Sequence, residues 1–340
     1  MNKGILKEKS FRFAVLCQRY ISPLCERILR VKPAMTMRQM FIDMTVVRVF
    51  IMLIAVVLAA CSKDNNPEPE PDITYINGIT RVFEYVPAPG QFINVLPEAT
   101  AGDTPESMRK KAEAALTNSS MISLGGFGGY VVFGFDHTIV NREGKDFVVL
   151  GNALTTWAEA GVILVSSDAN GNGLPDDEWY EIAGSEYNKP TTVKHYEITY
   201  YKSETEPDNP NEPDYIRWTD NRGQSGYLSK NSAHTQTYYP VWMGDSYTAK
   251  GTFMETTVHN QSGIWVSPPY DWGYADNFPN NDAKAQIDID WAVDKNGNPV
   301  KLKGIDFVKV YTGNRAEGGM FGEISTEVSG FTDLNLQTNK

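Results

Sequence analysis

The hydrophobic and polar positions of this chain repeat mostly with a period of two. Residues 193–201 and 287–293 alternate throughout, and shorter β-branched and aromatic runs lie between Gly, Asn and Pro turns over most of the chain after residue 72. Because successive side chains of a strand point to opposite faces, this period predicts β-strands. Many short strands with regular turns predict a mainly β fold, a β-sandwich of jelly-roll-like type. The runs interpreted as strands are 73–86 (as a hairpin or two short strands), 121–140, 147–153, 161–166, 193–201, 216–218, 226–228, 252–258, 263–266, 287–293 and 305–312.

One segment has a helical pattern instead. Thr104 can cap a helix that extends to Thr117, and Pro105 stands in its first turn. Proline suits this position because its missing N–H would have no partner there. Neither a composition shift nor an internal repeat divides the region that follows the N-terminal 72 residues. We therefore expect one short helix within a single β-sandwich domain over residues 73–335. The apolar face of the helix is formed by Met108, Ala112, Ala115 and Leu116.

The first 60 residues predict export. The apolar run 49–60 is shorter than the roughly 20 residues that span a bilayer, and its length suits the core of a signal peptide. Its end, Leu-Ala-Ala followed by Cys61, resembles a bacterial lipobox, in which the cysteine is lipidated and becomes the mature N-terminus. We interpret residues 1–60 as an N-terminal extension plus a lipoprotein signal peptide. A signal anchor with an incidental cysteine is the alternative.

Residues 61–72 form a polar segment rich in Pro, Glu and Asp that predicts a stiff, solvated tether. Acidic residues soon after a lipidated cysteine resemble surface-export signals. We therefore expect an outer membrane lipoprotein, held by its lipid anchor and exposed at the cell surface. A tether that faces the periplasm is the alternative.

Charge and cysteine content limit the classes of function. Residues 1–60 hold 10 of the 31 Lys and Arg and 3 of the 42 Asp and Glu, so the remainder carries 21 basic against 39 acidic residues. This acidic net charge argues against nucleic acid as a partner, because proteins bind the phosphate backbone with a basic surface. No cysteine follows Cys61, which excludes a disulfide scaffold. Packing or a metal ion must hold the long loops.

The segment 168–181 has the pattern of a calcium loop. Asp and Asn alternate with other residues and a glycine follows at the sixth place, which is how a short loop wraps oxygen ligands around Ca²⁺. We expect a structural Ca²⁺ ion of modest affinity, and a plain Asn/Gly/Asp turn is the alternative. The spacing departs by one residue from an EF-hand, so either Glu178 or Glu181 is expected to close the site. The predicted ligands are Asp168, Asn170, Asn172, the Leu174 carbonyl, Asp176, Glu178 and Glu181.

Aromatic residues next to amides and carboxylates give a second candidate site. Flat apolar faces beside polar groups suit a ring-shaped ligand such as a sugar or a macrocycle. Most tryptophans nevertheless belong to a core, so only some of the set is expected to line a site. The residues predicted to bind a small-molecule or glycan ligand are Trp242, Tyr270, Trp272, Tyr274, Asp276 and Asn277.

Signals for catalysis are weak. The chain has no nucleophile elbow and no zinc-protease motif, and its four histidines lack metal-ligand spacing. Asp136 and His137 are expected to form a structural hydrogen bond. The glycines of 125–134 are expected to allow close approach of backbones, because no Lys-Ser/Thr pair follows as in a phosphate loop. Carboxylate pairs such as Asp288 and Asp290 leave a carbohydrate-active hydrolase open.

Six segments together resemble a family of Bacteroidota cell-surface lipoproteins that are often described as PKD-domain-associated. They are 87–94, 123–129, 135–137, 172–180, 272–277 and 306–313. PKD-like repeats, which members often carry, are absent here. The family's association with nutrient uptake, including corrinoid acquisition, implies ligand capture and an outer-membrane transporter as partner. A secreted hydrolase and a non-catalytic adhesin or structural surface protein are the alternatives.

Overall fold

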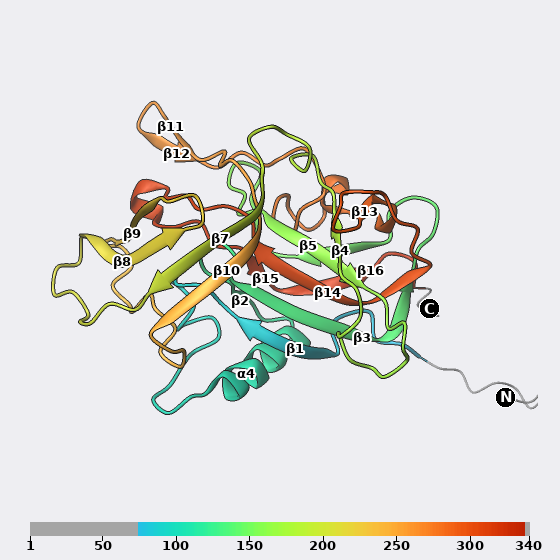
Figure 1. Ribbon diagram of the computed structural model, residues 1–340. Helices are drawn as coiled ribbons and strands as arrows, with labels where there is room; N and C mark the ends of the chain where they lie inside the picture. The colour runs from blue at the N-terminus through green and yellow to red at the C-terminus, as the bar shows by residue number, and fades with distance from the viewer. Residues whose placement is uncertain (1–73, 337–340) are drawn as a thin grey trace, which may run out of the picture. The chain divides into compact units, whose positions relative to one another are not determined.

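The computed structural model describes residues 74–336, which belong to one compact unit. The predicted signal peptide, the lipidation site Cys61 and the tether 61–72 lie outside the described residues. The described part is mainly β, with several antiparallel sheets and a single α-helix (Figure 1), which confirms the predicted fold class. In this part of the chain, no helix has the length and apolar character needed to cross a membrane.

The larger sheet has six antiparallel strands. Its centre is the strand β14, which the sequence predicted as 305–312, and hydrogen bonds join it to β3 on one side and β5 on the other. The order is β1 (Arg81–Val86), β3 (Tyr130–Val140), β14 (Gly304–Thr312), β5 (Gly161–Ser166), β6 (Tyr180–Ile182) and β13 (Ala292–Val293).

The second sheet has four antiparallel strands, and three smaller sheets have two strands each. The four-stranded order is β10 (Ser246–Phe253), β7 (Val193–Tyr201), β8 (Glu212–Asp220) and β9 (Ser225–Lys230). The strand β7 has the bounds that its alternation predicts. The small sheets pair β11 (His259–Gln261) with β12 (Ile264–Val266), β15 (Glu327–Val328) with β2 (Ile122–Ser123), and β16 (Gly330–Asp333) with β4 (Phe147–Leu150).

The six-stranded sheet buries both of its faces. On one face of β14, Val308 and Val310 pack into an apolar cluster that includes the buried side of the helix. On the opposite face, Tyr311 packs into a second cluster. The second cluster is shared with the four-stranded sheet. The Tyr311 hydroxyl accepts a hydrogen bond from the Thr252 backbone N–H at 2.7 Å, which ties β14 to β10. The two sheets therefore lie face to face around an aromatic-rich core.

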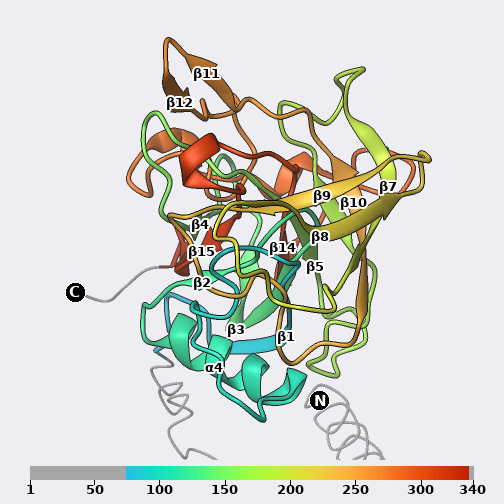
Figure 2. The same cartoon turned by 90° about the vertical axis from the view of Figure 1, so that its left-hand side faces the viewer.

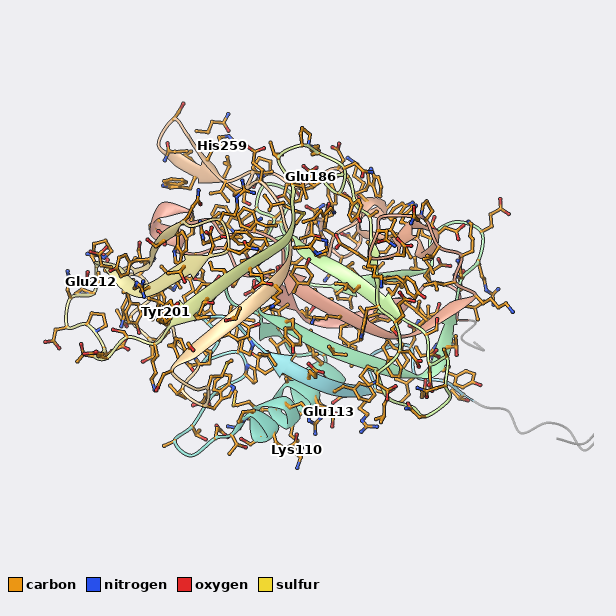
Figure 3. All side chains as sticks on the ribbon, viewed as in Figure 1. Lys110, Glu113, Glu186, Tyr201, Glu212 and His259 are labelled. Carbon is orange, nitrogen blue, oxygen red and sulfur yellow. The ribbon has the colours of Figure 1, made fainter. Side chains whose placement is uncertain are left out.

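The single helix, α4 (Pro105–Thr117), follows the predicted pattern. Thr104 and Ser107 form a capping box, and Met108, Ala112 and Leu116 are buried. Figure 2 shows the helix beside β1. Lys110 lies on its outer face (Figure 3).

The most regular alternation in the sequence gives little strand structure. Residues 287–293 contain the 3₁₀ turn η3 (Ile289–Trp291) and only the two-residue β13, so the predicted strand is wrong. The Asp288 side chain accepts from the Asp290 N–H at 2.9 Å, and Asp146 accepts from the Ile289 N–H at 2.9 Å. These side chains take the donors that a strand ladder would use.

The predicted hairpin at 73–86 is also absent from the described residues. Only β1 forms there, and it pairs with β3 rather than with a neighbouring strand. Glycines 125–129 allow close backbone approach, as expected. A Cβ at Gly129 would overlap the Leu124 carbonyl and the Ala88 backbone, so only glycine fits.

Candidate functional site

The loop that joins β5 to β6 gathers most of the predicted calcium ligands. The Asp168 carboxylate accepts from the backbone N–H groups of Asn172 at 3.0 Å and Gly173 at 2.9 Å. The amides of Asn170 and Asn172 both donate to the Asp176 carboxylate at 3.0 Å. Gly173 has a φ of 73°, the sharp turn that the pattern requires. Ca²⁺ binding at this loop stays a prediction.

Three other residues of the predicted set have separate roles. Leu174 is exposed, and its N–H donates to Asn172 at 2.7 Å. The Glu178 carboxylate accepts from the Tyr180 hydroxyl, and the Glu181 carboxylate accepts from Thr252 of β10 at 2.7 Å. Two acids outside the predicted set contact the loop's start: Asp306 accepts from the Asp168 N–H at 2.7 Å, and Asp177 accepts from the Ala169 N–H at 3.0 Å. Glu181 therefore belongs to a different region, because β6 directs its carboxylate toward β10.

The predicted aromatic site is mostly interior. Trp242 stacks on Tyr85 and is 8% exposed, while Tyr270 and Tyr274 are 5% and 4% exposed. Asn277 accepts from the Tyr270 N–H at 2.8 Å and donates to its carbonyl at 2.9 Å. Because the oxygen and the nitrogen of the buried Asn277 amide both form hydrogen bonds within the protein, this side chain is not available to a ligand. These residues therefore stabilise the loop that contains them.

Trp272 is the exception in this set. It is 36% exposed and packs against Trp291 with ring centroids 4.4 Å apart. The expectation of an exposed aromatic ligand face at 270–277 therefore does not hold, because four neighbours in that segment turn inward. The alternation of aromatic and polar residues that suggested it arises from a hydrogen-bonded loop.

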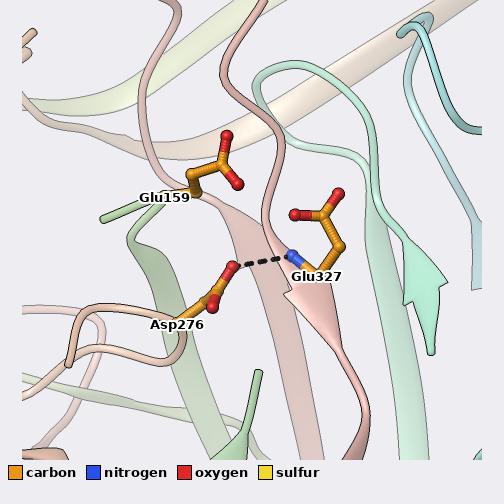
Figure 4. A group of neighbouring side chains, drawn as sticks. All are labelled: Glu159, Asp276 and Glu327. Atoms are coloured by element: carbon orange, nitrogen blue, oxygen red, sulfur yellow. Dashed lines mark hydrogen bonds between the residues drawn. The ribbon is translucent and has the colours of Figure 1, made fainter. Parts of the chain in front are cut away.

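Asp276, the remaining member of the set, belongs to a buried carboxylate cluster with Glu159 and Glu327 (Figure 4), here called the acidic trio. One carboxylate oxygen from each lies within 4.8 Å of the others. Asp276 accepts from the backbone N–H groups of Asn152 and Ala153 at 2.8 Å. It also accepts from the Glu327 N–H at 3.0 Å. These contacts join the segment before β5 to the start of β15.

Burial raises the pKa of all three carboxyl groups of the acidic trio, and the Glu327 charge further raises the pKa of Glu159 and of Asp276. Among the described residues, this is the one group of three acidic, His or Cys side chains close enough to hold a metal ion. Asp276 and Glu327 are each 3% exposed, so a polysaccharide has no access to them. The trio therefore suits a proton or a cation, not a glycosidase pair.

The largest of the described cavities, about 610 Å³, lies between the two sheets and is called the inter-sheet cleft. Strands β5, β6, β13 and β14 provide one wall, and β7 and β10 provide the other. Trp179, which directly follows the Asp168 loop, and Tyr187 add aromatic surface. Its volume falls within the range of about 300–1,000 Å³ that is usual for small-molecule sites. The inter-sheet cleft is the candidate functional site.

Burial displaces several titratable groups of the cleft toward their neutral forms, Lys194 and Glu181 among them. Burial lowers the pKa of Lys194 to about 8, although the Glu181 charge opposes this. Burial likewise raises the pKa of Glu181. The Lys194 ammonium lies 3.8 Å from the Glu181 carboxylate, and within the described residues it has no hydrogen-bond partner. Displaced pKa values and an unused donor in a cavity are typical of a functional site.

His195 adds backbone strain at the edge of the same cleft. Its φ is 53°, in the left-handed region that costs a non-glycine residue about 1–3 kcal/mol. The Asn221 amide donates to its carbonyl at 2.9 Å and helps to hold this conformation. The strain turns the chain within β7 directly beside Lys194.

A smaller cavity of about 180 Å³ lies at the other end of the four-stranded sheet. Trp218 and Tyr227 line it, and the Arg315 guanidinium stacks 3.5 Å above the Trp218 ring. Glu323 also borders this cavity. Burial raises the pKa of Glu323, and one of its oxygens has no partner among the described residues. This volume is below the usual range for small-molecule sites, so the inter-sheet cleft takes precedence.

Sequence reasoning missed most of the cleft. Lys194 and His195 stand in an alternating strand, where a Lys–His pair has no distinctive spacing. Their role depends on β10 and β14, which lie 50 to 120 residues further along. The expected Asp136–His137 hydrogen bond is present at 2.7 Å, and His137 also contacts Asp333 at 3.2 Å.

Comparisons of the chain with protein-family models and with curated proteins found no match.

Proposed function

We propose that this protein is a lipid-anchored surface protein that captures a carbohydrate in its inter-sheet cleft. The observation that carries the proposal is the cleft itself. It combines about 610 Å³ of space with the aromatic surface of Trp179 and Tyr187 and with hydrogen-bonding groups on both walls. Sugars bind in this way, with apolar ring faces on aromatic side chains and hydroxyl groups on polar ones.

The size of the cleft favours a short oligosaccharide over a corrinoid. A corrin macrocycle with its side chains is larger than the drug-sized ligands that clefts of this volume enclose. An outer-membrane transporter as the partner stays part of the proposal. Capture without cleavage is favoured over hydrolysis because Asp276 and Glu327 of the trio are closed to a polymer. In the cleft, two of the three acids, Glu181 and Glu197, lie 3.8 and 2.9 Å from lysine ammonium groups.

Binding is tested by titrating the full-length protein with neutral and acidic oligosaccharides while tryptophan fluorescence is recorded. We expect at least one sugar to change the emission, and Trp179→Phe to remove that change. Trp272→Phe is the matched control, since Trp272 packs on Trp291 outside the cleft. Calorimetry on the same panel provides a second readout, and no heat with any sugar would refute carbohydrate capture.

The anchor is tested separately because Cys61 lies outside the described residues. Wild type is expected in the membrane fraction with a lipid-modified N-terminus detectable by mass spectrometry. Cys61→Ser is expected to release the protein from membranes. An unmodified cysteine in the mature wild-type protein would remove the lipoprotein part of the proposal while leaving the cleft proposal intact.

A further inference from the structure

We infer that the carbohydrate held in the inter-sheet cleft is negatively charged, with Lys194 as the residue that recognises its anionic group. This inference rests on the proposed function and specifies its ligand class. It starts from the distribution of charge. After residue 60 the chain has 39 acidic and 21 basic residues, whereas four lysines line the cleft against three acids.

This excess of basic over acidic residues is confined to the lining of the cleft. Its charged residues are Lys194, Lys250, Lys295, Lys309, Glu181, Glu197 and Asp294. An acidic body repels an anion at long range. A site for an anion on such a body therefore needs cations gathered at the point of contact. A site for a neutral sugar has no such need, and it would be expected to share the acidic character of the surrounding surface.

Existing contacts occupy the other well-placed ammonium groups. Lys250 forms an ion pair with Glu197 at 2.9 Å, and the Lys309 ammonium lies 3.6 Å from the centre of the Tyr130 ring. Lys194, like Lys309, lies over an aromatic ring, that of Tyr187. It differs from the other lysines of the cleft in that its nitrogen is buried and has no hydrogen-bond partner within the described residues.

The acid nearest to Lys194 does not satisfy it. The shortest separation to Glu181 is 3.8 Å, which is too long for a hydrogen bond. Glu181 uses its other oxygen to accept from Thr252. An ammonium group has three donors, and a buried one that is unsatisfied is costly. The nitrogen itself is covered, but the Lys194 side chain is 33% exposed and lines the cleft, so a rotation away from the Tyr187 ring would let an anionic oxygen from a ligand supply the missing acceptor.

A charged acceptor suits this position better than a hydroxyl group. An ammonium group already forms stronger hydrogen bonds than a neutral donor, and an anionic acceptor adds the attraction between opposite charges, which a hydroxyl group lacks. A carboxylate or a sulfate substituent provides the same chemistry, so a uronic acid and a sulfated sugar are two sources of one interaction. The adjacent ring would then lie against Trp179 or Tyr187.

The test is calorimetry on the full-length protein with three ligands. They are a trimer of galacturonic acid, the same trimer as its neutral methyl ester, and a sulfated oligosaccharide of similar length. We expect at least one charged ligand to bind about tenfold more tightly than the ester, which corresponds to one charge-assisted hydrogen bond. This preference should shrink as salt is raised, because screening weakens a charged contact.

Lys194→Met is expected to bring the charged ligand and the ester to within about twofold of each other, whereas Lys194→Arg retains the preference. Lys301→Met is the matched control, because Lys301 is exposed and pairs with Asp290 outside the cleft. If Lys194→Met does not fold, the arginine variant and the salt dependence of the wild type decide the question.

The outcomes separate the two proposals. Equal binding of ester and acid, with the Trp179 signal intact, overturns the charge inference and leaves carbohydrate capture standing. A preference for charge that survives in Lys194→Met overturns the role of Lys194. No binding of any sugar refutes the proposed function, and with it the inference.

Discussion

The Asp168 loop and the acidic trio are both rich in carboxylates, but their surroundings give them different chemistry. The loop is largely exposed, and Asp168 and Asp176 are hydrogen-bonded to backbone N–H groups and amides only a few residues away. The trio is buried and unites segments that are up to 168 residues apart, and its carboxyl groups have raised pKa values. Similar side chains thus form a locally hydrogen-bonded loop at the surface and a cluster inside whose carboxyl groups favour the protonated form.

The largest expected effect comes from breaking the trio. Asp276→Ala leaves the N–H groups of Asn152, Ala153 and Glu327 without their acceptor. Each buried unsatisfied donor costs about 1–3 kcal/mol, so we expect a loss of about 3 kcal/mol after relief of the repulsion among the acids. Urea unfolding followed by circular dichroism measures this loss.

If Asp276→Ala does not fold, Asp276→Asn provides a less disruptive test of the same contacts. Asp276→Asn keeps one acceptor oxygen for the first two N–H groups, and we expect it to lose about 1 kcal/mol. A loss below about 0.5 kcal/mol in Asp276→Ala would show that the trio contributes little to stability.

The second effect is a dependence of stability on pH, measured in the presence of a chelator. The raised pKa values mean that the folded state binds more protons than the unfolded chain. The contribution of these groups to the free energy of unfolding is therefore complete below about pH 4, the usual pKa of an unfolded carboxyl group. It is lost as pH rises toward about 8, the pKa of Asp276 in the folded state. One excess proton gives a fall of about 1.4 kcal/mol between pH 6 and pH 7.

Removing one acid tests that assignment. Asp276→Asn is expected to flatten the slope, whereas Asp168→Ala leaves it unchanged because Asp168 is outside the trio. A free energy of unfolding that rises between pH 6 and pH 7 in wild type would contradict raised pKa values in the trio.

The smallest effect concerns calcium at the loop. With a dissociation constant near 10⁻³ M, the weak end of extracellular sites, 5 mM Ca²⁺ would stabilise the folded state by about 1 kcal/mol. Thermal unfolding with and without chelator measures this gain. We expect it to vanish in Asp168→Ala and to persist in Asp276→Asn. The reverse pattern would place the ion in the trio instead, and no gain in wild type would remove calcium from both regions.

Local patterns were sufficient for the elements that depend on neighbours in the sequence. The capping of α4 by Thr104, the bounds of β7 and the turn at Gly173 follow from residues within a few positions, so the sequence predicts them. The same reasoning failed at 287–293. There burial alternates only from Ile287 to Asp290 and changes phase at Trp291. Asp146, from another part of the chain, takes a backbone donor that a strand would need.

By itself the sequence determined the mainly β class, the one helix and the converging polar side chains of the Asp168 loop, because periodicity and turn chemistry are local properties. The tertiary structure alone decided that Tyr270, Tyr274 and Asn277 face inward, since burial depends on which layers pack together. It alone also produced the inter-sheet cleft and the acidic trio. Their walls and carboxylates come from strands and loops far apart in the chain, and no local pattern records which of them will meet.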